Sequence, residues 1–343
     1  MRSFLLLAAL SALAVSAASA VAETTLVPHV GGRVVQAEEG GYRFGWPGVY
    51  FEGRFTGPSV EVAVEPGADI LAVSIDGQAR GEIRGGTARL TLGDLGPGEH
   101  VVRLDKLTES QSGEARFIGF RAGEGGVALP PKARPRRMEF VGDSHTVGYG
   151  VRSPSRDCTE QQVHDLTDTS QAFGPILARR LDADYRIVAF SGRGVVRNFD
   201  GLAPGEPLPT LFPRVIPGLA EPRIDPSEVW RPDLVVIGLG TNDFSMPLHP
   251  GEAWADETAL RTDYRNAYVA FVQGLAVSRP GARFLLIAGD TFAEDVAEVA
   301  DRTGAMAVRI TGMEQTACHG HPSVRDQQMM ADRLAAAIAS PPQ

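Results

Sequence analysis

The sequence predicts an all-β domain of sandwich type followed by an α/β domain built on a parallel sheet. In residues 23–128, short runs of alternating apolar and polar residues are separated by turn signals. In residues 138–343, apolar strand-like runs alternate with helical patterns. The length of 343 residues also exceeds what one hydrophobic core usually supports. We therefore expect two domains, the first resembling a jelly roll.

Residues 1–22 are typical of a signal peptide that is not part of the fold. Arg2 gives a positive start, the stretch from Phe4 to Val15 is apolar, and small residues before residue 23 fit a cleavage site. The stretch is too short to span a bilayer, and an N-terminal membrane anchor is the alternative. We expect an exported protein, periplasmic or extracellular, with no membrane segment after signal removal. Such a compartment permits disulfides.

The first domain is predicted from five short strands. Residues 60–64 alternate so that one face points inward, and residues 71–75 precede Asp76-Gly77, a hairpin signal. The pattern continues at 89–92, 101–104 and 116–120.

Residues 129–137, LPPKARPRR, are predicted to form the linker. Proline prevents regular pairing, and the four basic residues keep the segment solvated. A basic patch for nucleic acid is the alternative. However, the chain has 33 Lys and Arg against 42 Asp and Glu, and nucleic-acid affinity needs concentrated basic charge. We therefore expect no nucleic-acid partner.

The second domain is predicted to have a parallel sheet covered by helices on both faces. Ligands of such sheets bind beyond the carboxyl ends of the strands, so this edge is where chemistry is expected. Strands are predicted at 138–142, 185–190, 234–239, 283–288 and 305–310, and helices around 172–181, 264–275 and 324–338.

Four candidate residues follow these strands or precede the last helix. Ser144 can be a nucleophile once a base removes its proton, and His321 could be that base. Gly192 allows a backbone N–H to approach a ligand closely, and Asn242 could donate to a developing oxyanion. Each alone also fits a turn or a helix cap. Together they predict acyl transfer through a serine ester.

The motifs resemble those of the SGNH (GDSL-like) hydrolase superfamily, and their order is the same. They are GDS at 142–144, Gly192, GTND at 240–243 and His321. More narrowly, the chain is similar to carbohydrate esterase family 2, the deacetylases of plant cell-wall polysaccharides. That likeness lies in SGRGVVRN at 191–198, HPSV at 321–324 and WPGVY at 46–50.

The resemblance implies a jelly-roll domain packed against a flavodoxin-like SGNH hydrolase domain, with O-acetyl removal from sugars through an acetyl-Ser144 intermediate. The oxyanion donors would be the backbone N–H groups of Ser144 and Gly192 and the side chain of Asn242. No metal or organic cofactor is expected. The expected partner is an acetylated polysaccharide or oligosaccharide such as xylan or glucomannan, and the expected state is a monomer.

One position departs from the superfamily pattern. Many members carry Asp three residues before the histidine, but Cys318 stands there. The resemblance then implies a Ser–His dyad whose His321 is oriented by a backbone carbonyl, while Asp326 or Glu314 could instead supply a carboxylate. A disulfide between Cys158 and Cys318 that braces the histidine loop is predicted, with two free thiols as the alternative.

Other residues near the motifs are weaker candidates. Phe199, Phe244 and Trp254 could stack on a sugar ring, or they could pack in the core. His145 could contact the substrate, but we expect it to pack or to face solvent. The alternative functions are a non-catalytic carbohydrate-binding protein and an SGNH lipase or thioesterase acting on longer acyl chains.

Overall fold

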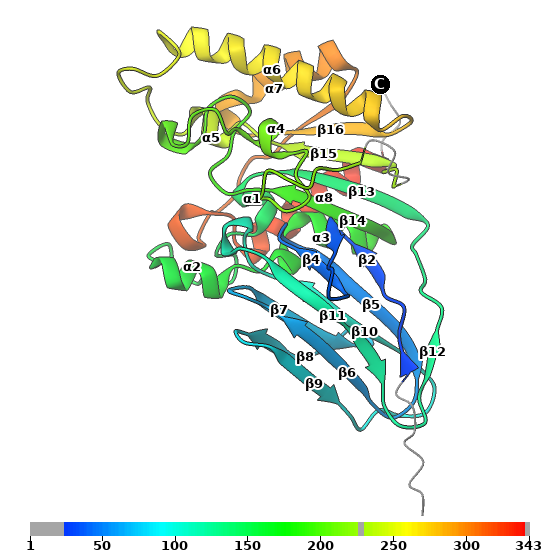
Figure 1. The fold of residues 1–343 in the computed structure, drawn as a ribbon. Coiled ribbons are helices and arrows are strands. Elements are labelled where there is room, and N and C mark those ends of the chain that lie inside the picture. Colours follow the sequence, from blue (N-terminus) through cyan, green and yellow to red (C-terminus); the bar gives the residue numbers. More distant parts are fainter. Residues whose placement is uncertain (1–23, 226–229, 340–343) are drawn as a thin grey trace, which may run out of the picture.

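The computed structural model describes residues 24–225 and 230–339. The predicted signal peptide lies outside the described residues. Within the described ranges, no helix is both long and apolar enough to cross a membrane. Figure 1 shows an N-terminal β-domain below a C-terminal domain in which helices flank a sheet.

The β-domain is a sandwich of two antiparallel sheets, which confirms the expected all-β architecture. The first sheet has the order β3 (Val34–Gln36), β4 (Tyr42–Phe44), β11 (Ala115–Ala122), β6 (Val60–Glu65) and β9 (Ala88–Leu92), with β1 (Thr24–Thr25) beside β11. The second has the order β12 (Val127–Leu129), β5 (Tyr50–Thr56), β10 (Glu99–Lys106), β7 (Ile70–Ile75) and β8 (Gln78–Arg84), with β2 (His29–Gly31) beside β5.

The alternating residues of β6 face the sandwich core. Val60, Val62 and Val64 are fully buried. At the centre of the core, the ring of Phe51 stacks on that of Phe117 with centroids 4.1 Å apart. Aromatic side chains bury large apolar areas, so this stack holds the two sheets together.

The predicted hairpin between β7 and β8 is confirmed. Ile75 pairs with Gln78, which leaves a two-residue turn. Asp76 and Gly77 both have positive φ, at 51° and 76°. This is the backbone that a two-residue hairpin turn of type I′ requires. Strand β8 itself was not predicted, because its residues are nearly all exposed and do not alternate.

The C-terminal domain has the expected parallel sheet between two layers of helices. Its order is β14 (Ala183–Ala189), β13 (Arg136–Gly142), β15 (Leu234–Gly238), β16 (Arg283–Ala288) and β17 (Met306–Arg309). Helices α6 (Glu257–Ser278) and α7 (Ala293–Thr303) cover one face, and α3 (Phe173–Arg180) and α8 (Val324–Ala339) cover the other (Figure 1). The strand order reverses at β13, the place where such sheets bind ligands.

Short helices occupy the connections. They are η1 (Ser110–Ser112), α1 (Ser144–Val147), α2 (Glu160–Leu166), η2 (Thr169–Gln171), η3 (Phe199–Gly201), α4 (Leu208–Leu211), α5 (Thr241–Phe244), η4 (Asp290–Phe292) and η5 (Cys318–Gly320).

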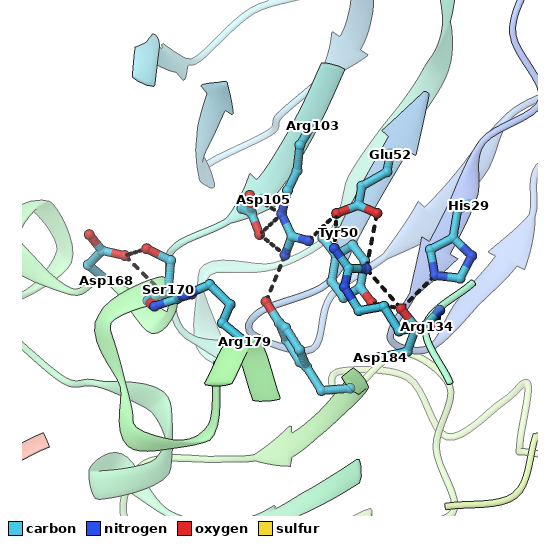
Figure 2. A network of polar contacts seen from close by, with 11 residues as sticks. His29, Tyr50, Glu52, Arg103, Asp105, Arg134, Asp168, Ser170, Arg179 and Asp184 are labelled. Carbon is cyan, nitrogen blue, oxygen red and sulfur yellow. Dashed lines mark hydrogen bonds and ion pairs between the residues drawn. The ribbon is translucent and has the colours of Figure 1, made fainter. Parts of the chain in front are cut away.

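The connection between the domains runs from the end of β12 at Leu129 to the start of β13 at Arg136. Most of this connection is exposed, as expected, but Arg134 is partly buried. The Arg134 guanidinium pairs with Glu52 of β5 at 2.7 Å and with Asp184 of β14 at 2.9 Å (Figure 2). The connection therefore ties a strand of one domain to a strand of the other.

A second arginine extends this contact between the domains. Arg103 of β10 pairs with Glu52 and Asp105, and it donates to the Tyr185 hydroxyl of β14 at 3.0 Å. Its guanidinium also lies 3.8 Å from the centre of the Tyr50 ring. The charged groups of Arg103, Arg134, Glu52 and Asp184 are thus paired, as burial of charge requires.

Candidate active site

Ser144 is the first residue of α1, directly beyond the end of β13. Gly142 has to be small, because a Cβ there would lie 2.0 Å from the Thr146 hydroxyl oxygen. Asp143 caps the short helix by accepting the His145 N–H at 3.0 Å. Capping by Asp is common where the first N–H groups of a helix lack partners. The strand-to-helix turn thus holds Ser144 at the carboxyl edge of the sheet.

His321 lies within hydrogen-bond distance of this serine. Its Nε2 is 2.9 Å from Ser144 Oγ, and its Nδ1 is 2.9 Å from the Cys318 carbonyl oxygen. Since a carbonyl can only accept, Nδ1 carries the proton and Nε2 is free to accept from the serine hydroxyl. Burial lowers the pKa of His321 to about 3, with a smaller contribution from His145. The ring is neutral, as a general base must be.

The two carboxylates considered as alternatives do not contact His321. Asp326 accepts the backbone N–H groups of Glu314, Gln315 and Ser323 at 2.8–2.9 Å, so it organises the chain on both sides of the histidine. Glu314 forms an ion pair with a neighbouring arginine at the surface. The histidine is therefore oriented by a carbonyl.

A disulfide and a histidine brace the segment that carries His321. Cys158 and Cys318 form a disulfide bond. Cys318 packs on the turn that follows Ser144, since a Cβ at Gly150 would lie 2.5 Å from Cys318 Cβ. His319 bridges the same two segments, with Nε2 2.8 Å from the Cys158 carbonyl oxygen and Nδ1 2.9 Å from the Tyr149 hydroxyl.

Two rings enclose the imidazole of His321. The Tyr149 ring stacks on it with centroids 4.1 Å apart at 27°, and the His145 ring meets it edge-on at 5.7 Å. Burial lowers the pKa of His145 to about 4, so this ring is also neutral. Of the two expectations for His145, packing is the one observed. Tyr149 was missed, because a tyrosine near a motif carries no signal that it stacks on the histidine.

Gly192 follows β14 and has φ +81°, a conformation that L side chains rarely adopt. Its carbonyl accepts the Phe199 N–H at 2.8 Å, which folds the loop back on itself. Within the described ranges, no protein group accepts the N–H of Gly192 or the N–H of Ser144. Both N–H groups therefore lack a protein partner among the described residues.

Asn242 lies in α5 beyond the end of β15 and is buried. Its Nδ2 donates to the Arg193 carbonyl at 2.9 Å and to Asp143 Oδ2 at 3.2 Å. Burial raises the pKa of Asp143 to about 7, although the His145 N–H acts in the opposite direction. Asn242 thus links the turns that follow β13, β14 and β15.

Asp243 holds the loop after Gly192, a role that sequence reasoning did not find. Its carboxylate accepts the backbone N–H groups of Val195, Val196 and Arg197 at 2.9–3.1 Å. Burial raises the pKa of Asp243 to about 6, against the effect of these hydrogen bonds. Its position in the GTND motif was the available signal, but that suggested only a local turn.

Comparison with known proteins gives the same assignment over nearly the whole chain. Residues 30–131 match the carbohydrate esterase 2 N-terminal family, and residues 140–338 match the GDSL-like lipase/acylhydrolase family. An acetylxylan esterase/glucomannan deacetylase of Cellvibrio japonicus is 37% identical over 89% of each chain. The chain belongs to carbohydrate esterase family 2.

Solved structures agree with this assignment of the esterase. One is a carbohydrate esterase whose active site has divergent catalytic and non-catalytic binding functions, with a TM-score of 0.83 and 36% identity over 92% of this chain and 98% of the other. Another is a family 2 carbohydrate esterase from Clostridium thermocellum in complex with cellohexaose, with a TM-score of 0.80 and 28% identity over 91% and 98%.

Two of the three candidate aromatic residues of the esterase lie beside an open groove. The loops 196–205 and 249–254 line a groove of about 610 Å³. Trp254 is one of its lining residues. Phe199 is 44% exposed, and its chain neighbours Asn198 and Asp200 line the same groove.

The third aromatic candidate, Phe244, packs inside the esterase. Its ring lies 4.9 Å from the Tyr264 ring and 6.0 Å from the Phe292 ring, and the Arg261 guanidinium lies 4.5 Å from its centre. The alternative of core packing therefore describes Phe244.

In the part of the esterase that the structure describes, no group of three or more His, Cys, Asp or Glu residues could hold a metal ion.

Proposed function

We propose that this esterase removes O-acetyl groups from plant cell-wall polysaccharides or oligosaccharides, such as xylan and glucomannan, through an acetyl-Ser144 intermediate. The observation that carries the proposal is the 2.9 Å contact between Ser144 Oγ and a neutral His321 whose proton is fixed on Nδ1. The name of the Cellvibrio japonicus relative supports the substrate class.

In the proposed first step, His321 Nε2 takes the proton of Ser144 Oγ as that oxygen attacks the acetyl carbonyl carbon. The tetrahedral oxyanion accepts the N–H groups of Ser144 and Gly192, which have no protein acceptor among the described residues. The imidazolium then protonates the departing sugar oxygen. Water attacks the acetyl ester by the same route and releases acetate.

Asn242 is the third proposed oxyanion donor. Both hydrogens of its amide already have protein acceptors, and the 3.2 Å contact with Asp143 is the longer one. On binding the oxyanion, the Asn242 amide would give up this longer contact with Asp143. The contact with the Arg193 carbonyl would keep the amide in position.

Phe199 and Trp254 are proposed to contact the glycan beyond the acetylated sugar. Their place on the loops 196–205 and 249–254 that line the groove supports this, since aromatic faces stack well on sugar rings. Phe244 is not part of this proposal.

Acetate release from acetylated xylan and acetylated glucomannan, measured beside acetyl, butyryl and octanoyl aryl esters, tests the function. We expect acetate release that Ser144→Ala reduces to background while the melting temperature stays unchanged. Preference for octanoyl esters would favour a lipase. Glycan binding without hydrolysis of any ester would favour a carbohydrate-binding protein.

We also infer that the protein is exported and monomeric. The signal-like pattern of residues 1–22 and the disulfide between Cys158 and Cys318 support export to an oxidising compartment. N-terminal sequencing of the protein recovered from periplasm and medium should begin near residue 23. Recovery in the cytoplasm with residues 1–22 intact would contradict export, and light scattering checks the oligomeric state.

A further inference from the structure

A loop of the β-domain reaches the active site of the other domain. It connects β10 to β11 and contacts the C-terminal domain through its backbone and its side chains. The Leu107 carbonyl accepts the Thr169 N–H at 3.0 Å and the Thr169 hydroxyl at 2.9 Å. The Ser110 hydroxyl donates to the Ala189 carbonyl, at the end of β14, at 2.7 Å.

Between these contacts lies Glu109, whose carboxylate accepts the hydroxyl of Ser191. Ser191 directly precedes Gly192, whose N–H is a proposed oxyanion donor. We propose that Glu109 is a positioning residue of the esterase, supplied by the β-domain, which holds Ser191 and thereby aims the Gly192 N–H at the oxyanion. This inference rests on the proposed function, because it presumes an oxyanion at Gly192.

The β-domain also holds the backbone of Glu109 in place. The Lys106 ammonium is buried and donates to the Glu109 carbonyl at 3.0 Å and to the Thr108 hydroxyl at 3.1 Å. The same ammonium forms an ion pair with buried Asp69. A buried cation with several oxygen partners makes a rigid support, since an unpaired one would be strongly unfavourable. The loop therefore reaches Ser191 in one defined conformation.

The charge of Glu109 should depend on pH near neutrality. Burial raises the pKa of Glu109 to about 7, the Ser191 hydroxyl and the Lys106 charge act in the opposite direction, and Glu160 adds to the rise. Burial and the Glu109 charge both raise the pKa of Tyr149, whose ring covers His321. A hydroxyl binds a carboxylate more strongly than a neutral carboxyl, so the hold on Ser191 weakens as Glu109 is protonated.

Kinetics of matched variants on an acetyl aryl ester test the inference. Glu109→Ala should lower kcat by about tenfold to a hundredfold with little change in KM, because small misplacements of catalytic groups are costly. Glu109→Gln keeps an acceptor for the serine but no charge, so its kcat should lie between those of the wild type and Glu109→Ala. Glu114→Ala, on the same loop but in an exposed pair with Arg43, should keep the wild-type kcat.

A double-mutant cycle separates positioning from simple docking of the loop. If Glu109 acts through Ser191, the losses of kcat in Glu109→Ala and Ser191→Ala should not add in the double variant. Ser110→Ala removes a docking contact without touching Ser191, and it should cost less in kcat than Glu109→Ala. Additive losses, or equal losses in Ser110→Ala and Glu109→Ala, would overturn the inference.

The dependence of kcat on pH distinguishes a positioning role of Glu109 from a merely structural contact. The ratio of wild-type kcat to that of Glu109→Gln should exceed one above pH 7 and approach one as the pH falls below it. A ratio independent of pH, or an unchanged kcat in Glu109→Ala, would count against Glu109. Ser144→Ala, assayed in parallel, keeps the two proposals distinct, because its full activity would contradict the serine mechanism whatever Glu109 does.

Discussion

His321 is oriented by the carbonyl of Cys318 instead of by a carboxylate. A carbonyl dipole fixes the tautomer and the ring direction, but it stabilises the imidazolium less than a full negative charge would. The rings of Tyr149 and His145 restrict the imidazole further. In this esterase, packing therefore does part of the orienting that a carboxylate does in a triad.

The dyad makes a prediction about side chains. His321→Ala should lower kcat by a factor on the order of 10⁴–10⁶, since it removes the base. Glu314→Ala should change kcat by no more than about twofold, as expected for a surface substitution. Steady-state kinetics on an acetyl aryl ester compare the two. A loss in Glu314→Ala comparable to that in His321→Ala would restore a triad.

The oxyanion site makes a second prediction. Asn242→Ala should reduce kcat by about 10²–10³, the usual cost of removing one oxyanion donor. KM should change little, because the charge develops only in the transition state. Asn266→Ala is a suitable control, since Asn266 lies on α6 and contacts a surface arginine. Equal kcat values in the two variants would show that Asn242 has another role.

The sequence allowed prediction of where the four motif residues lie but not of the side chains that hold them. Ser144 and Asn242 each follow an apolar strand, so their arrival at one edge could be predicted from the pattern. Tyr149, Asp243 and Glu109 act through contacts between segments that fold together only in three dimensions. Their local sequence carries no signal of those contacts.

Among the elements, the segment before α8 depends most on a disulfide and hydrogen bonds to distant parts of the chain. Its η5 turn includes His319 at φ +54°, a left-handed conformation for a residue with a side chain. The disulfide and the contacts of His319 with Tyr149 and Cys158 hold this turn against the turn after Ser144. The distance between His321 and Ser144, the proposed base and nucleophile, is therefore set by tertiary contacts.

The disulfide is expected to contribute to both stability and activity. Cys158→Ser with Cys318→Ser should lower the melting temperature by roughly 5–15 °C, since the bond closes a loop of 160 residues. It should also lower kcat, because the carbonyl that orients His321 belongs to Cys318. Calorimetry and kinetics check both, with Thr303→Ser as a control distant from the site. Full activity after reduction of the wild type would contradict the bracing role.

For the whole molecule, the β-domain and the α/β domain share ion pairs that join distant parts of the chain. Asp184 accepts hydrogen bonds from His29, Tyr50 and Arg134. Burial acts to raise the pKa of Asp184, but these bonds outweigh it and hold the pKa well below its usual range. The two-domain architecture could be predicted because the hydrophobic period changes along the chain. The contacts of Asp184 that dock the two domains could not be predicted, because the residues that form them are far apart in sequence.

The ion pairs make a prediction about acid stability. A carboxyl with a lowered folded-state pKa stabilises the fold above its unfolded-state pKa of about 3.9, and that stability is lost as the pH falls further. Asp184→Asn should therefore cost on the order of 3 kcal/mol at pH 7, and less as the pH falls from about 4 toward the folded-state pKa. Urea unfolding at several pH values checks this, with exposed Asp233→Asn as control. A difference independent of pH would refute the electrostatic origin.

The carbonyl of Cys318 also affects how the proposed catalytic pair tolerates mutation. A carboxylate that orients a histidine disappears with a single codon change, whereas a main-chain oxygen is present whatever amino acid occupies the position. Selection on this contact therefore acts on the path of the backbone, not on the identity of one side chain. The orienting group of this esterase cannot be deleted by substitution, only displaced.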